Sequence, residues 1–320
     1  MMKNKLTIPL ISACLIISGG LAVLSGCDNY YKDDYVDNSP TSGKLKVFCS
    51  EGLVTHVQNQ AFTFCAQYSR ATVEVVAMNE KDAIDLLLKD SCKSIIITRL
   101  LGNTEKQAFS EKQLNPGYSP IAKTGIALIT NTATPIDRMT IDQVKELLKN
   151  EITLKDSLGR SISPVAVLDN KNSSVCNFLL DSLIQKVKFG PKCFALENTL
   201  ALIKQISETP NQIGFIDFAW LSDVDDSLFK QVKDKIKFIP LAASGHIYYA
   251  PNQSSFKTGT YPLTRTVYFL RRTDDFSLAK GFESFLAGPK GQLTFLKQGL
   301  LPIRQAERNI EVKMEPMNTQ

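Results

Sequence analysis

Short apolar segments of strand character alternate along this chain with amphipathic helical segments, and this alternation limits the fold more than any other feature. Strands that alternate with helices build βαβ units around a mostly parallel sheet, with helices on both of its faces. Three consecutive isoleucines in the third strand are typical of a strand that is covered on both sides. The strands of this first unit are expected at 45–49, 72–77 and 94–98, and its helices at 53–68 and 82–89.

A second unit of the same kind follows. One of its helices is expected to begin at Thr140, because Thr140 and Gln143 have the spacing of a capping box. The last strand and helices of the chain are too few to form a domain alone, so we expect them to return to the first unit. The polar run between His246 and Tyr261 is expected to be a surface loop. The remaining strands are expected at 125–130, 164–168, 213–218, 236–241 and 266–270, and the remaining helices at 173–187, 277–286 and 289–297.

The first 27 residues have the pattern of a lipoprotein signal peptide. Lys3 and Lys5 precede an apolar stretch at 6–24, and Ser25 and Gly26 follow this stretch directly before Cys27. These small residues fit a lipobox, in which the Cys27 thiol takes a diacylglycerol. An uncleaved membrane-spanning anchor is the alternative, because the apolar stretch is nearly long enough for one. Both interpretations place the rest of the chain outside the cytoplasm.

The segment at 28–43 is polar and short of aliphatic residues, so it is expected to be a flexible tether. Its Lys32-Asp33-Asp34 resembles an acidic signal that sends some lipoproteins to the cell surface, although a solvated tether explains these charges equally well. The expected location is therefore the bacterial cell envelope, lipid-anchored with the folded part in the periplasm, and surface exposure stays open. Lys and Arg exceed Asp and Glu by 37 to 32 without a run of like charge, so no nucleic acid is expected as a partner.

Residues that could support catalysis are sparse. The chain has two histidines, His56 and His246, and none of the motifs HExxH, GxSxG or GxxxxGK[ST]. We therefore expect a protein that is not an enzyme, with no catalytic residues, no metal and no cofactor, and a hydrolase of phosphate esters is disfavoured. Five cysteines remain after Cys14 and Cys27, none in a CxxC motif. They are expected to be buried as small apolar residues, with at least one free thiol.

Polar segments stand where several strands end and helices begin. Ser50-Glu51-Gly52 follows the first strand, and Lys171-Asn172-Ser173-Ser174 follows the strand at 164–168. The free amides of a helix start suit an oxyanion, and open α/β sheets bind ligands beyond the carboxyl ends of their strands. The alternative is that Ser50, Asn172 and Ser173 are ordinary helix N-caps, because N-caps need the same residue types.

Thr98-Arg99 closes the strand of three isoleucines and adds a fixed positive charge. A guanidinium carries donors that match the geometry of an oxyanion. A solvated arginine, or one held in a salt bridge, is the alternative for Arg99. The junctions together predict an oxyanion site.

Five segments in family order make the chain resemble the phosphate-binding lipoproteins that serve ABC importers, in the periplasmic binding-protein superfamily. The similarity runs from about Lys44 to the region of Arg308. The segments are IAKTGIALITN at 121–131, TIDQVKELLKNEIT at 140–153, NQIGFIDFAW at 211–220, YPLTRTVYFL at 261–270 and AGPKGQLTFLKQGLLPI at 287–303.

The resemblance implies a type II-like clamp of two α/β domains with mixed, mostly parallel sheets, joined by a two-segment hinge. The hinge crossings would lie near 121–124 and 241–245. The implied organisation is a signal peptide at 1–27, a tether at 28–43, domain I at 44–122 plus 245–312, domain II at 123–244 and a tail at 313–320.

The resemblance also implies a ligand and partners. Inorganic phosphate or a related oxyanion would be held between the domains and delivered by the monomeric, lipid-anchored protein to an ABC permease in the inner membrane. The ligand-binding residues would be Ser50, Glu51, Gly52, Thr98, Arg99, Lys171, Asn172, Ser173 and Ser174.

The third ligand loop departs from the family pattern. Val175 stands where typical members have a threonine, and Asp169 stands where many have an arginine. Glu51 is expected to accept the proton of monohydrogen phosphate, which would disfavour sulfate. The departures leave open an envelope sensor or accessory interaction lipoprotein with the same fold and a lost or altered ligand.

Overall fold

The computed structural model describes residues 38–149, 152–155, 158–185 and 187–304. The predicted signal peptide, the lipidated Cys27, residues 28–37 of the predicted tether and the tail at 313–320 lie outside the described residues. The last residues of the predicted tether belong to the fold, because Ser42 is buried and Gly43 begins the first strand. Within the described part of the chain, no helix is both long and apolar enough to cross a membrane.

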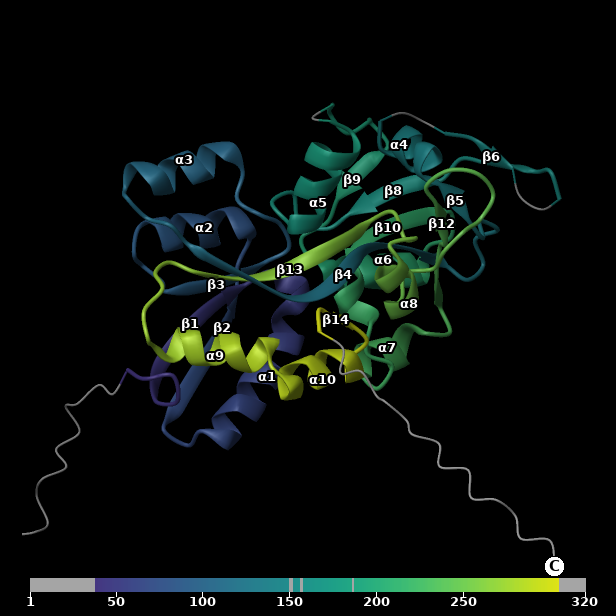
Figure 1. Ribbon diagram of the computed structural model, residues 1–320. Helices are drawn as coiled ribbons and strands as arrows, with labels where there is room; N and C mark the ends of the chain where they lie inside the picture. Colours follow the sequence, from purple (N-terminus) through teal and green to yellow (C-terminus); the bar gives the residue numbers. More distant parts are fainter. Residues whose placement is uncertain (1–37, 150–151, 156–157, 186, 305–320) are drawn as a thin grey trace, which may run out of the picture. The chain divides into compact units, whose positions relative to one another are not determined.

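Ten strands form one mixed sheet (Figure 1). Their bounds are β1 Gly43–Cys49, β2 Ala71–Ala77, β3 Ser94–Ile97, β4 Gly117–Asn131, β8 Val165–Leu168, β9 Cys193–Ala195, β10 Gln212–Asp217, β11 Ile236–Phe238, β13 Thr264–Arg271 and β14 Leu301–Pro302. The main order is β2-β1-β3-β13-β4-β10-β8-β9, and β11 and β14 also pair with β4. The neighbours in β2-β1-β3 and in β10-β8-β9 are parallel, whereas β13 and β4 run antiparallel to their neighbours. The mixed α/β class predicted from the sequence is confirmed.

Two small sheets and a set of helices complete the described fold. The small sheets pair β5 Met139–Thr140 with β12 Leu241–Ala242, and β6 Leu154–Lys155 with β7 Ser161–Ile162. Single turns of 3-10 helix occur at Glu51–Leu53 and Phe218–Leu221, and a turn of π-helix at Leu179–Leu183. The α-helices are α1 Val54–Gln67, α2 Glu80–Leu88, α3 Asn103–Glu111, α4 Ile141–Lys149, α5 Ser174–Phe178, α6 Thr199–Glu208, α7 Ser227–Val232, α8 Gln253–Thr258, α9 Leu278–Ala287 and α10 Pro289–Lys297.

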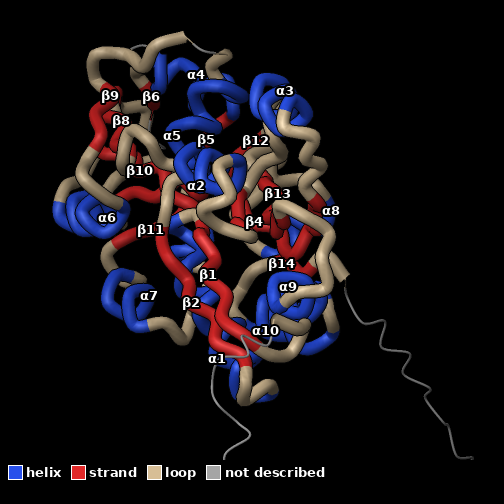
Figure 2. The backbone as a smooth tube through the Cα atoms, turned by 90° about the vertical axis from the view of Figure 1, so that its left-hand side faces the viewer, coloured by secondary structure: helices blue, strands red, loops and turns tan. Residues whose placement is uncertain are grey.

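Helices cover both faces of the sheet around β3. Ile96 belongs to an apolar cluster with Phe64 of α1, and its neighbours Ile95 and Ile97 belong to another cluster with Phe109 of α3. Successive strand residues point to opposite faces, and both faces are covered here, so all three isoleucines are fully buried. The prediction that β3 is covered on both sides is therefore confirmed. Figure 2 shows the neighbouring strands β1 and β2 running side by side next to α1.

The capping box predicted at the start of α4 is present. The Thr140 amide donates to the Gln143 side chain at 2.8 Å, and the Gln143 amide donates to the Thr140 hydroxyl at 3.2 Å. These two bonds satisfy amides that have no partner inside the helix. Sequence spacing therefore located this helix start correctly.

The strand β4 links the two parallel groups. It pairs with β13 up to Gly125 and with β10 from Ile126 onward. The predicted crossing at 121–124 lies directly before this change of partner. At the second predicted crossing, 241–245, the strand β12 pairs with β5. The next strand of the large sheet, β13, begins only at Thr264. The division into two hinged domains stays a prediction.

One expectation is wrong: the polar run at 246–261 is not only a surface loop. It contains α8, which begins with a capping box between Asn252 and Ser255. Phe256 is fully buried, and its ring lies 5.3 Å from that of Phe218. A single phenylalanine in a polar run gives no helical periodicity, so the pattern missed a helix that tertiary packing stabilises.

All five cysteines in the described part of the chain are free thiols. Cys49, Cys92 and Cys176 are buried, whereas Cys65 and Cys193 are half-buried. Burial raises the pKa of Cys92 to about 11 and that of Cys176 to about 12, so these thiols stay protonated at neutral pH. The prediction that cysteines act as small buried apolar residues is confirmed for these three.

Candidate functional site

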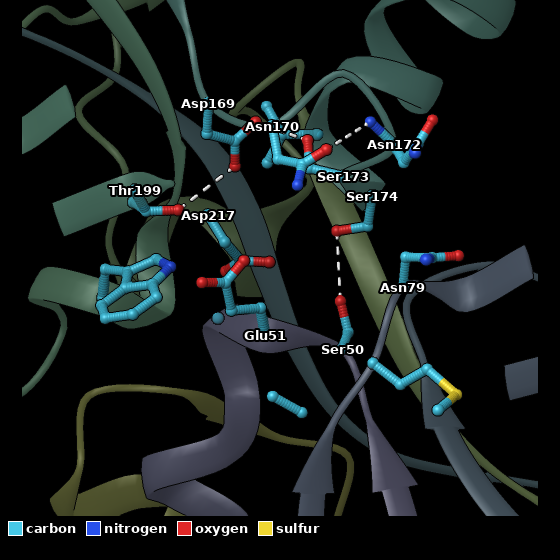
Figure 3. A pocket seen from close by; sticks show the side chains of 15 residues that line it. Ser50, Glu51, Asn79, Asp169, Asn170, Asn172, Ser173, Ser174, Thr199 and Asp217 are labelled. Carbon is cyan, nitrogen blue, oxygen red and sulfur yellow. Dashed lines mark hydrogen bonds between the residues drawn. The ribbon is translucent and has the colours of Figure 1, made fainter. Parts of the chain in front are cut away.

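A cavity of about 210 Å³ lies at the carboxyl ends of β1, β2, β8 and β10 (Figure 3). We call it the serine cavity. Open α/β sheets hold their ligands at this end of the strands, because the loops there join strand to helix. Its lining residues are Ser50, Glu51, Gly52, Ala77, Met78, Asn79, Asp169, Asn170, Asn172, Ser173, Ser174, Val175, Thr199, Asp217 and Trp220.

Two serine hydroxyls from distant parts of the chain meet in this cavity. Ser50, which follows β1, donates from Oγ to Ser174 Oγ at 3.2 Å. Ser50 precedes a helical turn but makes no side-chain capping bond, so its hydroxyl is not used as a cap. Arg265 Nη1 donates to the same Ser174 Oγ and to the Ser174 carbonyl, both at 3.2 Å. Since Ser174 Oγ accepts two hydrogen bonds, its own hydrogen is available to a ligand.

Ser173 has a different role, because it caps α5. Its Oγ accepts from the Cys176 amide at 3.0 Å and donates to Asp169 Oδ1. Asn172 lines the cavity from an exposed position, and its amide donates to the side chain of Asn170 at 2.8 Å. The capping alternative therefore describes Ser173 and does not describe Ser50.

Asp169 is a buried carboxylate, and no Lys or Arg in the described part of the chain pairs with it. It accepts hydrogen bonds from Ser173, from Thr199 Oγ1 at 3.2 Å and from Cys176 Sγ at 3.6 Å. Burial raises the pKa of Asp169 to about 6, and the nearby Glu51 adds to the rise while the hydroxyl bonds oppose it. Burial also raises the pKa of Glu51. The cavity wall thus holds two carboxyl groups that keep protons more readily than usual.

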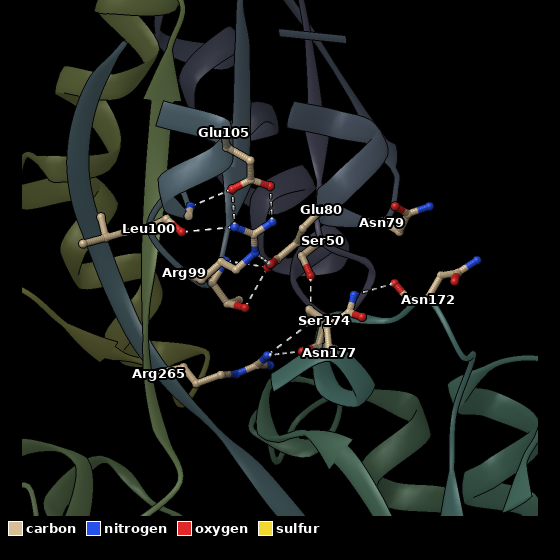
Figure 4. A network of polar contacts seen from close by, with 12 residues as sticks. Ser50, Asn79, Glu80, Arg99, Leu100, Glu105, Asn172, Ser174, Asn177 and Arg265 are labelled. Carbon is tan, nitrogen blue, oxygen red and sulfur yellow. Dashed lines mark hydrogen bonds and ion pairs between the residues drawn. The ribbon is translucent and has the colours of Figure 1, made fainter. Parts of the chain in front are cut away.

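Asp217 differs from Asp169 because an arginine pairs with it. Arg265 Nη2 donates to Asp217 Oδ2, and the side chains of both residues are almost fully buried. Asp217 Oδ1 accepts from Thr124 Oγ1 at 2.7 Å and from the Ala219 amide at 2.9 Å. Arg265 thus contacts both Asp217 and Ser174, and Figure 4 shows its guanidinium pointing toward Ser174, whose hydroxyl it fixes.

Six of the nine residues predicted to bind ligand line the cavity together, and three do not. The six are Ser50, Glu51, Gly52, Asn172, Ser173 and Ser174. Lys171 is exposed and is absent from the lining. Thr98 donates from its amide and its hydroxyl to Glu80 Oε1, at 2.6 and 2.7 Å.

Arg99 is occupied by two carboxylates, as Figure 4 shows. Its Nη1 and Nη2 bind the two oxygens of Glu105 at 2.7 and 2.8 Å, and its Nε lies 3.4 Å from Glu80 Oε2. The side chain is about one-third exposed and is absent from the cavity lining. The salt-bridge alternative therefore describes Arg99 in this structure.

Sequence reasoning missed Arg265 and Asp217, although each carried a signal. Both stand inside apolar strand segments, Arg265 in TRTVYFL and Asp217 in IGFID. A charged residue within such a segment is expected to be buried, and a buried charge requires a partner. Two opposite charges of this kind could have been predicted to pair.

Gly52 allows the first loop to pass close to β10. A β-carbon added at Gly52 would lie 2.8 Å from the Asp217 β-carbon and 3.3 Å from Trp220 Nε1. The first distance is too short for any real side chain, so only glycine fits without a shift of the loop. Gly52 therefore positions Ser50 and Glu51 against the second half of the site.

The cavity supports binding by hydroxyls and carboxyl groups. Among its described lining residues none is Lys or Arg, and Arg265 reaches it only through Ser174. No group of three or more His, Cys, Asp or Glu side chains in the described part of the chain is arranged to hold a metal ion.

The known proteins that resemble this chain include phosphate-binding proteins. Phosphate-binding protein PstS of Pseudomonas aeruginosa is 21% identical over 299 residues, which cover 87% of this chain and 89% of that protein. Phosphate-binding protein PstS of Bacillus subtilis is 20% identical over 310 residues, 95% of each chain. A solved phosphate ABC transporter substrate-binding protein from Clostridium perfringens superposes with a TM-score of 0.68 at 18% identity, covering 82% of this chain and 100% of that one.

These findings confirm the resemblance that the five sequence segments carry. Residues 37–290 match the family described as the PBP superfamily domain, which is most of the chain. The chain therefore belongs to the PBP superfamily.

Proposed function

We propose that this chain is an extracytoplasmic solute-binding protein that captures inorganic phosphate, or a similar oxyanion, in the serine cavity. Two relatives that match most of its length are named phosphate-binding proteins. A solved structure with the same fold carries bound phosphate. These likenesses support a phosphate ligand, and the residues of the cavity must account for how it is held.

The remaining parts of the proposal concern the cell. We infer that Cys27 carries the lipid anchor and that the folded part lies in the periplasm. Labelling of intact cells would test the alternative of surface exposure. The liganded monomer would dock on an ABC permease of the inner membrane and would not be an enzyme. Nucleic acid has no part in this proposal. Labelling with a radioactive fatty acid, which a Cys27→Ser chain should not incorporate, tests the anchor.

The observation that carries the proposal is the meeting of Ser50 and Ser174. Their hydroxyls lie 3.2 Å apart although they follow different strands, and Ser174 has a hydrogen to donate. Arg265 donates to Ser174 Oγ, and this charge-assisted bond makes the serine hydroxyl a better donor. An oxyanion placed between the two hydroxyls would replace their mutual contact with two bonds to the ligand.

Asp169 and Glu51 suit a ligand that carries a proton. Monohydrogen phosphate has an O–H that a carboxylate accepts, whereas sulfate meets only an unpaired buried charge. The loop residues Gly52, Asn172 and Ser173 would complete the enclosure. The Glu51→Gln change should weaken the preference for phosphate over sulfate in calorimetry, and an unchanged preference would remove Glu51 from this role.

Calorimetric titration of the unlipidated chain with phosphate, arsenate and sulfate tests the proposal. We expect heats of binding for phosphate and arsenate and none for sulfate. Ser174→Ala should weaken phosphate binding about ten-fold, because a hydrogen bond to a charged ligand contributes roughly 1.5 kcal/mol. Ser110→Ala, an exposed serine on α3, is the matched control. A flat trace with all three anions would overturn phosphate as the ligand.

The proposed clamp closes about a hinge. Domain I would comprise 44–122 plus 245–312 and domain II 123–244, with the serine cavity between the loops of both. Small-angle X-ray scattering should then give a smaller radius of gyration with saturating phosphate than without it. Equal radii in the two states would reject hinged closure without rejecting phosphate binding.

A second candidate function is an envelope sensor or accessory protein whose ligand has been lost or altered. Two observations favour it: Arg99 is bound by Glu105 and Glu80, and no Lys or Arg is among the described lining residues. A site of this charge does not attract a free dianion from a distance. The flat trace described above is the result that this candidate predicts.

A further inference from the structure

A second cavity of about 200 Å³ adjoins the serine cavity. The two cavities share three lining residues, Glu51, Gly52 and Trp220, so these residues form the boundary between them. We call the second one the acceptor cavity. Its remaining lining residues are Thr55, His56, Asn59, Leu200, Ala219, Asp223, Asp226, Leu228 and Gln298.

Two buried side chains of the acceptor cavity each have a hydrogen-bond acceptor without a partner. The Ser222 hydroxyl donates to the Gln298 carbonyl at 2.7 Å, and His56 Nε2 lies 3.0 Å from that hydroxyl and 3.3 Å from that carbonyl, so the hydrogen is assigned to Nε2. His56 Nδ1 is then an acceptor, and it has no partner among the described residues. Gln298 Oε1 is also an acceptor without a partner among the described residues. His56 is 4% exposed and Gln298 6%, and buried acceptors of this kind are normally satisfied.

The charges around the acceptor cavity favour a cation. Asp223, Asp226 and Glu51 line it, and none of its described lining residues is Lys or Arg. Burial lowers the pKa of His56, so the imidazole is neutral at pH 7 and adds no positive charge. Trp220 adds an aromatic ring, which attracts a cation over its face. A primary ammonium group offers three donors to such a set of acceptors.

We propose that one ligand occupies both cavities: a small zwitterion with a phosphate or phosphonate group and a primary ammonium group. Its oxyanion would lie between Ser50 and Ser174, and its ammonium group among Asp223, Asp226 and the face of Trp220. The proposal rests on oxyanion binding in the serine cavity and names the substrate class of that site.

The charge of the combined site explains why a zwitterion fits better than free phosphate. Glu51 and Asp169 can accept the proton of monohydrogen phosphate, but they also add negative charge beside it, and Arg265 is already paired with Asp217. A zwitterion brings its own positive charge to the acidic side of the site. Inorganic phosphate would leave the acceptor cavity empty and the acidic side chains that line it without a cation.

Titration with four probes tests the inference: phosphoethanolamine, glycerol 3-phosphate, inorganic phosphate and ethanolamine. Phosphoethanolamine should bind at least about ten-fold tighter than glycerol 3-phosphate, which has a phosphate ester and a tail of similar size but no ammonium group. Equal affinities of these two, or equal affinities of phosphoethanolamine and ethanolamine, would overturn the inference.

The same titrations separate this inference from the proposed function. If phosphate binds and phosphoethanolamine binds no better, the zwitterion fails while the oxyanion site stands. If none of the phosphate probes binds, the oxyanion site fails and the zwitterion fails with it. Either result is decided by the heats of binding alone.

A pair of aspartates in one loop provides the variants. Asp223→Asn should lower the preference for phosphoethanolamine over glycerol 3-phosphate about ten-fold, because a charge-assisted bond is lost. Asparagine keeps the acceptor that binds the Asp225 amide at 2.9 Å, so the loop should stay folded. Asp225→Asn removes a charge from a side chain that is 91% exposed, and the preference should not change. The same preference in both variants would remove the acceptor cavity from the site.

Discussion

Two arginines lie near the ends of strands in this sheet, and the carboxylates around them give them different roles. Arg99 follows β3, is about one-third exposed and binds Glu105 with both of its terminal nitrogens. Arg265 lies within β13, is almost fully buried and donates both to Asp217 and to Ser174. A position after a strand is therefore not sufficient to bring a cation into the site. The carboxylates that surround each guanidinium decide where it points.

The same contrast separates the two buried aspartates of the serine cavity. Asp217 has Arg265 as its partner, whereas the described donors to Asp169 are two hydroxyls and a thiol. A buried carboxylate without a cation holds its proton to a higher pH, and the pKa of Asp169 is raised to about 6. The cavity thus combines a fixed ion pair on one side with a carboxyl group that titrates near neutral pH on the other.

The largest expected effect comes from removing Arg265. Arg265→Ala should lower the free energy of unfolding by about 3–5 kcal/mol, because it leaves Asp217 as an unpaired buried charge. Chemical denaturation measures this loss. Phosphate binding should be lost as well, since Ser174 loses the donor that fixes its hydroxyl.

A second substitution keeps the Arg265 prediction testable if the single variant does not fold. In the double variant Arg265→Met with Asp217→Leu, neither charge of this pair is left buried, and most of the stability should return. Phosphate binding should stay lost in this folded double variant. Recovery of wild-type affinity would remove Arg265 from the site.

Asp169→Asn has the next largest expected effect, and its size depends on pH. The pKa of Asp169 rises from 3.8 to about 6 on folding, so the protonated form stabilises the folded chain below about pH 4. This contribution is lost as the pH rises through 6, at a cost of up to about 3 kcal/mol. The variant, which cannot ionise, should therefore exceed the parent in stability at pH 8 and approach it at pH 4. Parallel stability curves for the two proteins between pH 4 and 8 would contradict the raised pKa.

Most of the fold could be predicted from the sequence because periodicity reports burial. The strands β3 and β10 are runs of mostly apolar residues that are buried in the structure, whereas the apolar residues of β1 alternate with lysines. The capping box at Thr140 predicted the start of α4 correctly. The elements that were missed, such as α3 and α8, are short helices rich in polar residues. Their stability comes from contacts with distant residues, which no local pattern contains.

The site was predicted less completely, for a physical reason. Loop residues beside strand ends could be named from their order, and Ser50 and Ser174 do lie in one cavity. The partners of charged residues could not be named in this way. Glu105 stands six residues after Arg99, and Asp217 stands 48 residues before Arg265. Which carboxylate reaches which arginine depends on the packing of whole elements.

Two glycines extend the comparison to the loops that accompany each arginine. Gly52→Ala should cost about 1–3 kcal/mol of stability and weaken phosphate binding, because the new β-carbon would lie 2.8 Å from that of Asp217. Gly102→Ala is the matched control beside the Arg99 pair, where the nearest atom, Glu105 Oε2, lies at 3.6 Å. Its cost should be below about 1 kcal/mol. Equal losses of stability on thermal denaturation would show that the two loops are equally tight.

The smallest effect is expected from Arg99→Ala. Its guanidinium is partly exposed and binds Glu105 and Glu80, so its loss should lower stability by about 1 kcal/mol. Phosphate affinity should stay within about two-fold of the parent, because Arg99 does not line the serine cavity. Combining Arg99→Ala with Glu105→Ala should cost less than the sum of the two single changes, since they break the same pair. A ten-fold loss of phosphate affinity in calorimetry would instead place Arg99 in the site, in the role that its position after β3 first predicted.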